Sequence, residues 1–282
     1  MKYITCLFFS LLLFVCFCKA QSPGDTLVLR DIDLDATSPA NMIELNIPSA
    51  GSLLQGFIYK ANGPAKHPTL LLLHGYPGNE RNLDLGQVAR ARGWNVVYFD
   101  YRGSWASRGV FSFKHCVEDV VNVVAFCKKF SDSLQVDTAN IALFGHSMGG
   151  WVCLKALQQL PGVKKGFALS TWDIYQTVAA LKGDYEKIKQ DAGNYFVLNA
   201  TAKQQFEPVV KNPAYYNLAN DGKALAGKAI VMLDEHDRNQ QIADALKAEN
   251  KKYFDYQVWQ TDHPFTNKRI ALIKMVMDFL NK

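Results

Sequence analysis

The fold of this 282-residue chain is decided by ten residues, Ile141–Gly150, which read IALFGHSMGG. Four apolar residues predict a buried strand, and the pattern G-x-S-x-G that follows predicts a tight turn into a helix. In such a turn the serine takes a backbone conformation that most side chains resist, and Gly145 and Gly149 remove the side chains that would collide there. The turn also points the backbone N–H of Met148 at the place where an oxyanion forms. We therefore predict Ser147 as a nucleophile.

A second glycine-rich loop, His74–Gly78 (HGYPG), follows another apolar run. Such a loop can supply the second oxyanion donor. The N–H of Tyr76 is the simplest choice, because Pro77 has no N–H to donate. We expect His74 to be structural, with a hydrogen bond inside its own loop. We expect a structural role also for His146, which occupies the variable position of the serine turn.

A serine hydroxyl is a weak nucleophile at neutral pH and needs a base. Where G-x-S-x-G ends a strand, the chain order is serine, then acid, then histidine. Of the six histidines, only His236 and His263 follow Ser147. His263 lies in a loop between the last expected strand and the last expected helix, where it can reach the serine. We predict His263 as the base.

The acid is expected after the penultimate strand, where the segment DEHD (234–237) follows Ala229–Leu233. We favour Asp237 over Asp234, because the acid typically comes a few residues past the strand. For Asp234, Glu235 and His236 the alternative is a solvated loop. We do not expect a metal site there, and no cysteine and histidine spacing predicts zinc elsewhere.

Strands and helices alternate along most of the chain, which predicts an α/β fold with a mostly parallel sheet covered by helices on both faces. The first three strands, Thr26–Asp35, Met42–Ile47 and Leu53–Tyr59, are expected to be antiparallel. Further strands are expected at Thr69–Leu73, Asn95–Phe99, Ile141–Phe144, Gly166–Leu169, Ala229–Leu233 and Tyr253–Trp259. Helices are expected at Leu83–Arg92, Val117–Phe130, Gly149–Leu160, Gln240–Lys251 and Arg269–Leu280.

Residues 171–226 interrupt this alternation. They are richer in polar residues and tyrosine, with weak helical patterns near 174–191 and 200–211. We predict a small helical cap inserted over the carboxyl edge of the sheet. Trp105, Trp172 and Tyr175 are candidate walls of a substrate pocket, with ordinary packing as the alternative.

The first twenty residues resemble a secretory leader. A lysine at position 2 precedes an apolar stretch from Ile4 to Phe17, and Cys18-Lys19-Ala20 is a small-x-small cleavage site. We expect a signal peptide at 1–20, export of the protein, and a single domain at 21–282. Three cysteines remain, Cys116, Cys127 and Cys153, and we expect small buried side chains with at most one disulfide, through Cys153.

Composition excludes several classes of function. The net charge is +5, and no run of lysine and arginine exceeds two residues, so the chain lacks the electrostatic footprint of a nucleic-acid-binding protein. We expect no cofactor, no metal and no stable membrane insertion once the leader is removed. The expected partner is a small-molecule ester or a short peptide substrate.

Several motifs resemble the α/β-hydrolase superfamily, and within it the prolyl-oligopeptidase-like and dienelactone-hydrolase-like branches. They are HGYPG, Asp100–Gly103 (DYRG), VD at 136–137, GHSMGG and DHPF at 262–265. The match runs from about Leu53 to the C-terminus. It implies an α/β-hydrolase fold, Ser147, Asp237 and His263 as the triad, and a structural role for Asp100 and Arg102. One departure is Asp234, where the family often has glycine.

Three functions fit these residues. The first is an exported serine hydrolase that cleaves an ester through an acyl-enzyme. The second is an aminopeptidase or a peptidase similar to dipeptidyl peptidases, which would present carboxylates to the free amine of its substrate. The insertion offers five carboxylates for this: Asp173, Asp184, Glu186, Asp191 and Glu207. The third is a non-catalytic binding protein on the same fold.

Overall fold

A computed structural model describes residues 31–185, 187 and 196–282. Residues 32–282 form one compact unit. The expected signal peptide, most of the strand expected at Thr26–Asp35, and the carboxylates Glu186 and Asp191 lie outside the described residues. Residues 31–35, which are described, are not in a strand.

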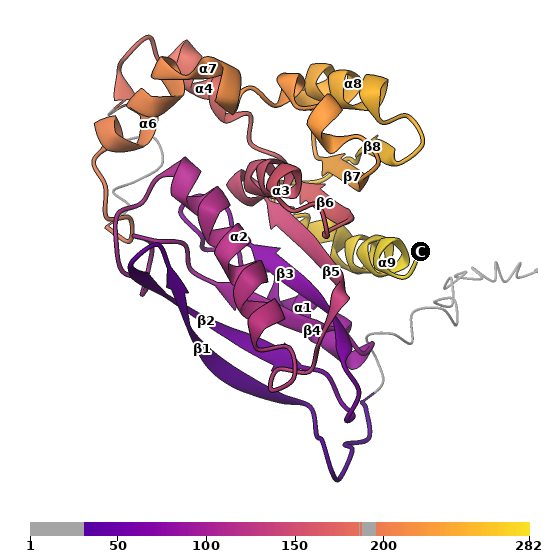
Figure 1. Ribbon diagram of the computed structural model, residues 1–282. Coiled ribbons are helices and arrows are strands. Elements are labelled where there is room, and N and C mark those ends of the chain that lie inside the picture. The colour runs from indigo at the N-terminus through magenta and orange to yellow at the C-terminus, as the bar shows by residue number, and fades with distance from the viewer. Residues whose placement is uncertain (1–30, 186, 188–195) are drawn as a thin grey trace, which may run out of the picture. The chain divides into compact units, whose positions relative to one another are not determined.

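The described residues form one eight-stranded sheet with the order β1-β2-β4-β3-β5-β6-β7-β8 (Figure 1). The first two strands join it in antiparallel pairs, and every pair from β4 to β8 is parallel. This is the sheet of an α/β-hydrolase, as the sequence predicts. The strands are β1 (Asn41–Ser49), β2 (Ser52–Lys60), β3 (His67–Leu73), β4 (Asn95–Phe99), β5 (Val136–His146), β6 (Lys165–Leu169), β7 (Ala229–Asp234) and β8 (Phe254–Val258).

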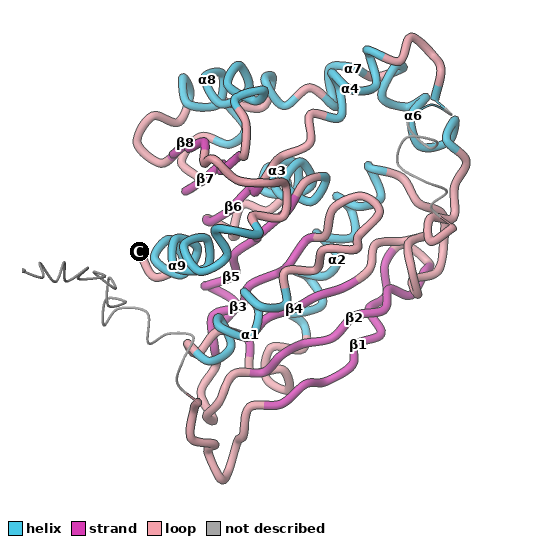
Figure 2. The backbone as a smooth tube through the Cα atoms, turned by 180° about the vertical axis from the view of Figure 1, so that it is seen from behind, coloured by secondary structure: helices cyan, strands magenta, loops and turns pink. Residues whose placement is uncertain are grey.

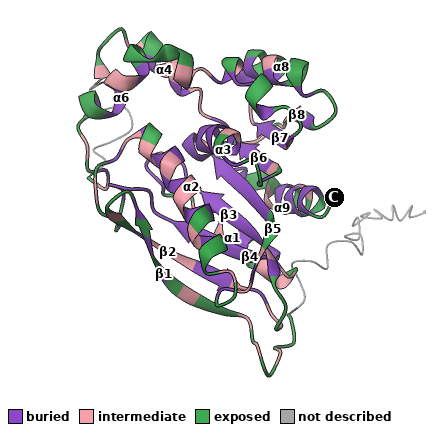
Figure 3. Cartoon of the chain, viewed as in Figure 1, coloured by how far each residue is buried: buried purple, intermediate pink, exposed green. Residues whose placement is uncertain are grey.

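Helices cover the two faces of the sheet (Figures 1 and 2). Helices α1 and α9 contribute to one apolar core, and α2, α3 and α8 contribute to the core on the opposite face. Because both faces are covered, the central strands are buried and consist of nearly continuous apolar residues (Figure 3). These helices are α1 (Leu83–Ala91), α2 (Phe113–Lys129), α3 (Met148–Gln159), α8 (Gln240–Glu249) and α9 (Arg269–Leu280).

The expected boundaries hold within a few residues, with two larger differences. Helix α2 begins four residues earlier than expected, because the side chain of Ser112 accepts a hydrogen bond from the backbone N–H of His115 and so caps the helix. Strand β5 begins five residues earlier, at Val136, where it pairs with His67 before an irregularity in the register.

The insertion at 171–226 contains the helices α4 (Ile174–Ala180), α6 (Ala202–Lys211) and α7 (Pro213–Tyr216), which contact one another. Two side chains of α3 bind the insertion. The ammonium group of Lys155 lies 3.0 Å from the carboxylate of Asp221 in a buried ion pair, and the indole N–H of Trp151 donates to the carbonyl of Tyr216 at 3.0 Å. The helix that follows Ser147 therefore also anchors the insertion.

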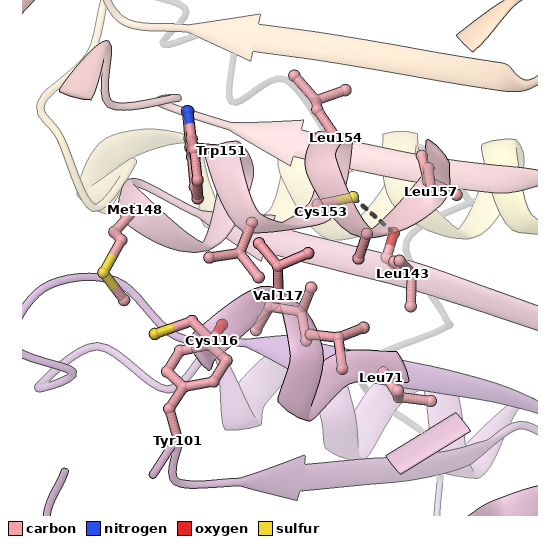
Figure 4. Packing of buried hydrophobic residues seen from close by; sticks show 14 of the residues in the cluster. Leu71, Tyr101, Cys116, Val117, Leu143, Met148, Trp151, Cys153, Leu154 and Leu157 are labelled. Carbon is pink, nitrogen blue, oxygen red and sulfur yellow. Dashed lines mark hydrogen bonds between the residues drawn. The ribbon is translucent and has the colours of Figure 1, made fainter. Parts of the chain in front are cut away.

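The three cysteines of the described residues are free and buried. The Cys153 thiol points from α3 toward the carbonyl of Leu143 on β5, among leucines of the core (Figure 4). These thiols serve as small apolar side chains, because burial raises the pKa of each and keeps it protonated. In the part of the chain that the structure describes, no helix combines the length and apolar character needed to cross a membrane.

A buried ion pair ties three segments together beneath the carboxyl edge of the sheet. The guanidinium Nε of Arg102 donates to Asp119 of α2 at 2.6 Å, and the backbone N–H of Arg102 donates to the other carboxylate oxygen at 2.8 Å. The hydroxyl of Ser49, at the end of β1, donates to the same carboxylate. Arg102 thus has the structural position that the resemblance implies.

We predict that Asp119→Ala lowers the free energy of unfolding by about 3–5 kcal/mol, because it leaves the buried cation of Arg102 without its main partner. Glu118→Ala is the matched control. Glu118 also accepts a hydrogen bond from Arg102, at 2.8 Å, but its side chain is 39% exposed, so the loss is expected to stay below about 1 kcal/mol. Urea denaturation measures both. Equal losses would contradict the role given to Asp119.

Candidate active site

Ser147 occupies a sharp turn between β5 and α3. Its backbone has φ 59° and ψ −119°, a conformation that side chains rarely adopt. Two backbone hydrogen bonds, one from the N–H of Ser147 and one to its carbonyl, hold the turn. The N–H of Ser147 donates to Leu169 of the neighbouring strand at 2.8 Å, and its carbonyl accepts from the N–H of Trp172 at 3.1 Å. The serine is half-buried at the carboxyl edge of the sheet.

The glycines of the turn are required by space. A side chain at Gly145 would collide with the carbonyl of Gly149, and a side chain at Gly149 would collide with the carbonyl of Leu73 at the end of β3. Gly150 packs against Thr171 so closely that a Cβ would lie 2.7 Å from the threonine hydroxyl. The sequence G-x-S-x-G-G is therefore what allows the helix to begin this close to the sheet.

The second glycine-rich loop lies directly against the serine. A Cβ on Gly75 would lie 3.0 Å from the Cβ of Ser147 and 3.6 Å from its hydroxyl oxygen. The ring of His74 is buried, with its Nδ1 2.8 Å from the carbonyl of Gly75, so this histidine bonds within its own loop as expected. Burial lowers the pKa of His74 to about 4, which keeps it neutral at pH 7. The loop brings the backbone of Tyr76 to the edge of the site.

Tyr76 connects this loop to the insertion. Its hydroxyl donates to the side-chain carbonyl of Gln205 on α6 at 2.8 Å, and Gln205 is itself buried. The Tyr76 ring lies 5.5 Å from the ring of Trp172 and 6.3 Å from that of Phe206. An aromatic cluster therefore joins the glycine-rich loop to the insertion.

His263 lies at the same edge, in the loop between β8 and α9. Its Nδ1 is 2.8 Å from one carboxylate oxygen of Glu235, and the other oxygen of Glu235 accepts a hydrogen bond from the hydroxyl of Ser170 at 2.7 Å. Partial burial raises the pKa of Glu235, but the bonds from His263 and Ser170 outweigh burial and lower it to about 2. The histidine side chain is 51% exposed.

This arrangement differs from the one predicted, in which Asp237 contacts His263. Asp237 is exposed and begins a short turn (Asp237–Asn239), and the carboxylate that contacts His263 is Glu235. Two residues separate the turn from the end of β7. The turn is capped by the ring of His236, which accepts a hydrogen bond from the N–H of Arg238, and Asp237 faces solvent. The reading of Glu235 as part of a solvated loop is likewise wrong.

Asp234 has a different task. It is buried, and its two oxygens accept hydrogen bonds from the N–H of Thr171 and the side-chain amide of Asn239, each at 3.0 Å. Burial raises its pKa to about 6 in spite of these bonds. Asp234 thus ties the end of β7 to the start of the insertion, and its carboxylate is not directed to His263.

Of the proposed pocket walls, Trp172 and Trp105 adjoin the site. The backbone of Trp172 contacts Ser147, and the indole N–H of Trp105 donates to the carbonyl of Pro77 in the glycine-rich loop at 2.8 Å. Tyr175 is half-buried on α4 and packs against the core. The role of these three residues in substrate binding stays a prediction. Among the described residues, no three metal-ligating side chains gather to hold a metal ion.

Residues 51–275 match the sequence profile of the X-Pro dipeptidyl-peptidase (S15) family. The chain belongs to this family. S15 membership places it among the serine hydrolases of the α/β-hydrolase superfamily, in agreement with the sheet order and the serine turn.

Curated relatives match the chain over shorter segments. The YfhR protein of Escherichia coli O157:H7 is 32% identical over 136 residues, 46% of each chain. A probable dipeptidyl-aminopeptidase B of Emericella nidulans is 30% identical over 132 residues, which is 42% of this chain and 15% of that one. The chain spans less than half the length of these relatives.

Solved structures share the fold at low identity. The esterase Pf2001 of Pyrococcus furiosus has a TM-score of 0.64 and 18% identity, over 86% of this chain and 92% of that one. The carboxylesterase EstE1 from a metagenomic library has a TM-score of 0.65 and 17% identity, over 92% and 93%. These structural similarities show that this S15-family chain has the α/β-hydrolase fold.

The two acids of the β7 loop give different expectations for activity. We predict that Glu235→Gln lowers kcat by roughly 10⁴-fold, because the imidazole of His263 loses the carboxylate that orients it and stabilises its charged form. Asp237→Asn is the matched control and is expected to keep kcat, because Asp237 is exposed. Steady-state kinetics on an activated ester measures both. A large loss in the Asp237 variant alone would restore the original assignment.

The carboxylates of Glu235 and Asp234 are expected to change the stability of the protein with pH in opposite directions. The pKa of Glu235 in the folded protein, about 2, is below its ordinary 4.5, so its stabilising contribution is full above 4.5 and is lost as the pH falls toward 2. The pKa of Asp234, about 6, is above its ordinary 3.8, so its contribution is full below 3.8 and is lost as the pH rises to 6. We predict that Glu235→Gln loses less stability than the wild type between pH 4.5 and 2 in urea denaturation. Parallel curves would contradict this.

Proposed function

We propose that the protein is a serine hydrolase that cleaves a carboxylic ester through an acyl-enzyme, with Ser147 as nucleophile, His263 as base and Glu235 as the acid. One observation carries the proposal: the 2.8 Å contact between Glu235 and a half-exposed histidine at the edge of the sheet where Ser147 occupies its sharp turn. A carboxylate on Nδ1 fixes the tautomer that leaves Nε2 free to accept the serine proton.

The proposed mechanism assigns a step to each of these side chains and to two backbone N–H groups at the carboxyl edge of the sheet. His263 takes the proton of Ser147 as the hydroxyl oxygen attacks the carbonyl carbon of the substrate. The backbone N–H groups of Met148, at the start of α3, and Tyr76 stabilise the oxyanion of the tetrahedral intermediate. His263 then gives its proton to the leaving oxygen, and a water molecule hydrolyses the acyl-enzyme by the same steps.

The surroundings of the serine favour an ester with an apolar acyl group. The rings of Tyr76 and Trp172 lie 5.5 Å apart, and both residues belong to segments that contact the serine turn through their backbone or their neighbours. Two described carboxylates of the insertion have other partners: Asp173 caps α4, and Glu207 lies within 4 Å of two lysines of its own helix. Neither is thereby directed to the free amine of a peptide.

Peptide cleavage is the second candidate, and membership of the X-Pro dipeptidyl-peptidase family favours it. The leader-like sequence at residues 1–20 supports export as part of either proposal. The two substrate classes share the triad and the oxyanion donors, so they differ only in what the pocket recognises.

We expect a fluorophosphonate probe to label the wild type and to leave Ser147→Ala unlabelled, because the probe bonds to an activated serine oxygen. Labelling of the alanine variant would contradict the role of Ser147. With wild-type enzyme that has not been exposed to the probe, p-nitrophenyl esters of increasing acyl length are compared with aminoacyl- and X-Pro-p-nitroanilides. Higher kcat/KM on the esters supports the proposal, and higher kcat/KM on the anilides supports the peptidase. No labelling and no turnover would favour a binding protein on this fold.

A further inference from the structure

The residue directly before the nucleophile contacts the residue that carries the base. His146 ends β5 and is 2% exposed. Its Nε2 lies 3.0 Å from the backbone carbonyl oxygen of His263, and the two imidazole rings lie 4.9 Å apart. A carbonyl oxygen can only accept a hydrogen bond, so Nε2 of His146 carries the proton and donates it.

The second ring nitrogen of His146 shows that a histidine at this position opposes folding. Nδ1 of His146 is buried and has no hydrogen-bond partner in the part of the chain that the structure describes. Burial lowers the pKa of His146 to about 4, with a smaller effect from His263, so the ring is neutral at pH 7. An unpaired buried acceptor opposes folding, and an apolar side chain would avoid that penalty. Stability alone therefore does not account for a histidine at this position.

Among the side chains that the structure describes, no other is as well placed to hold this carbonyl. The hydroxyl of Ser170 lies 3.2 Å from it, but also 2.7 Å from the carboxylate of Glu235. A hydroxyl has one proton, and the shorter bond to a charged acceptor is the stronger of the two. Ser170 therefore serves Glu235, and His146 is the main side-chain donor to the carbonyl of His263.

The loop beyond His263 has separate anchors. Phe265 is fully buried, its N–H donates to the carbonyl of Asp262, and the guanidinium of Arg269 donates to the carbonyl of Pro264 at 3.0 Å. These contacts fix the loop on its helix side. Loss of the bond from His146 would thus leave the loop folded and free only the peptide that carries the imidazole.

We propose that His146 is a positioning residue for the base: its Nε2–H holds the main chain of His263, so that the imidazole stays on Glu235 and faces Ser147. The contact joins the strand that presents the nucleophile to the loop that presents the base. The inference rests on the proposed function, because it gives His263 a catalytic role.

The test compares two substitutions of His146 on the activated ester. His146→Gln places an amide N–H near the position of Nε2, and His146→Leu has no donor. We expect the leucine variant to lose about 10- to 100-fold in kcat with little change in KM, because a small misplacement of a catalytic group has effects of this size while the substrate contacts remain. The glutamine variant is expected to recover most of kcat.

His67→Leu is the matched control. His67 is also buried, with its Nδ1 3.1 Å from the carbonyl of Gly93, but it begins β3 and so lies at the amino edge of the sheet. We expect this variant to lose stability and to keep kcat per folded molecule. If His146→Leu does not fold, His146→Phe gives the same comparison with a ring that lacks a donor.

The outcomes separate the two proposals. A wild type without labelling or turnover overturns the proposed function. An active wild type together with a folded donor-free variant of unchanged kcat overturns only the role of His146. Equal losses in the glutamine and donor-free variants also overturn it, because the hydrogen bond is then not the property that matters.

Discussion

The rest of the site depends on one backbone constraint, the left-handed turn at Ser147. The conformation with φ 59° and ψ −119° is stable only because β5, α3 and the glycine-rich loop close around it. Their approach leaves no room for a side chain at Gly145 or Gly149. The turn places Ser147, half-buried, at the carboxyl edge of the sheet, and α3 begins at the next residue, Met148. Parallel strands deliver the other loops to this edge, since their carboxyl ends coincide.

The two neighbouring carboxylates Asp234 and Glu235 differ in burial, in hydrogen bonding and in pKa. Asp234 and Glu235 are adjacent in sequence, yet burial raises the pKa of the first to about 6, while hydrogen bonds lower that of the second to about 2. Side chains alternate along a strand, so the last residue of β7 faces the packed interior and the next one faces the edge. Glutamate at that next position is long enough to reach both His263 and Ser170.

How much the sequence could predict follows from this geometry. The sharp turn at Ser147 and the position of His263 in the loop between β8 and α9 could be predicted, because glycine spacing and the order of strands and helices constrain them strongly. The carboxylate that contacts His263 could not be predicted, since the usual distance past the strand points to Asp237 and not to Glu235. The turn that begins at Asp237 depends on a local bond from the N–H of Arg238 to the ring of His236, which no pattern of apolar residues encodes. The early start of α2 was also missed, because its cap at Ser112 precedes the apolar stripe.

Burial distinguishes the three histidines that surround the serine turn. His74 and His146 are buried, and burial lowers the pKa of each to about 4, so both are neutral and keep fixed hydrogen bonds to backbone carbonyls. His263 alone of the three is exposed, and its Nδ1 lies 2.8 Å from a carboxylate oxygen of Glu235. In the proposed mechanism one proton moves to and from the site, and imidazoles that stay neutral do not compete for it. The two neutral rings thus hold the backbone, and the proposed proton transfer is left to His263.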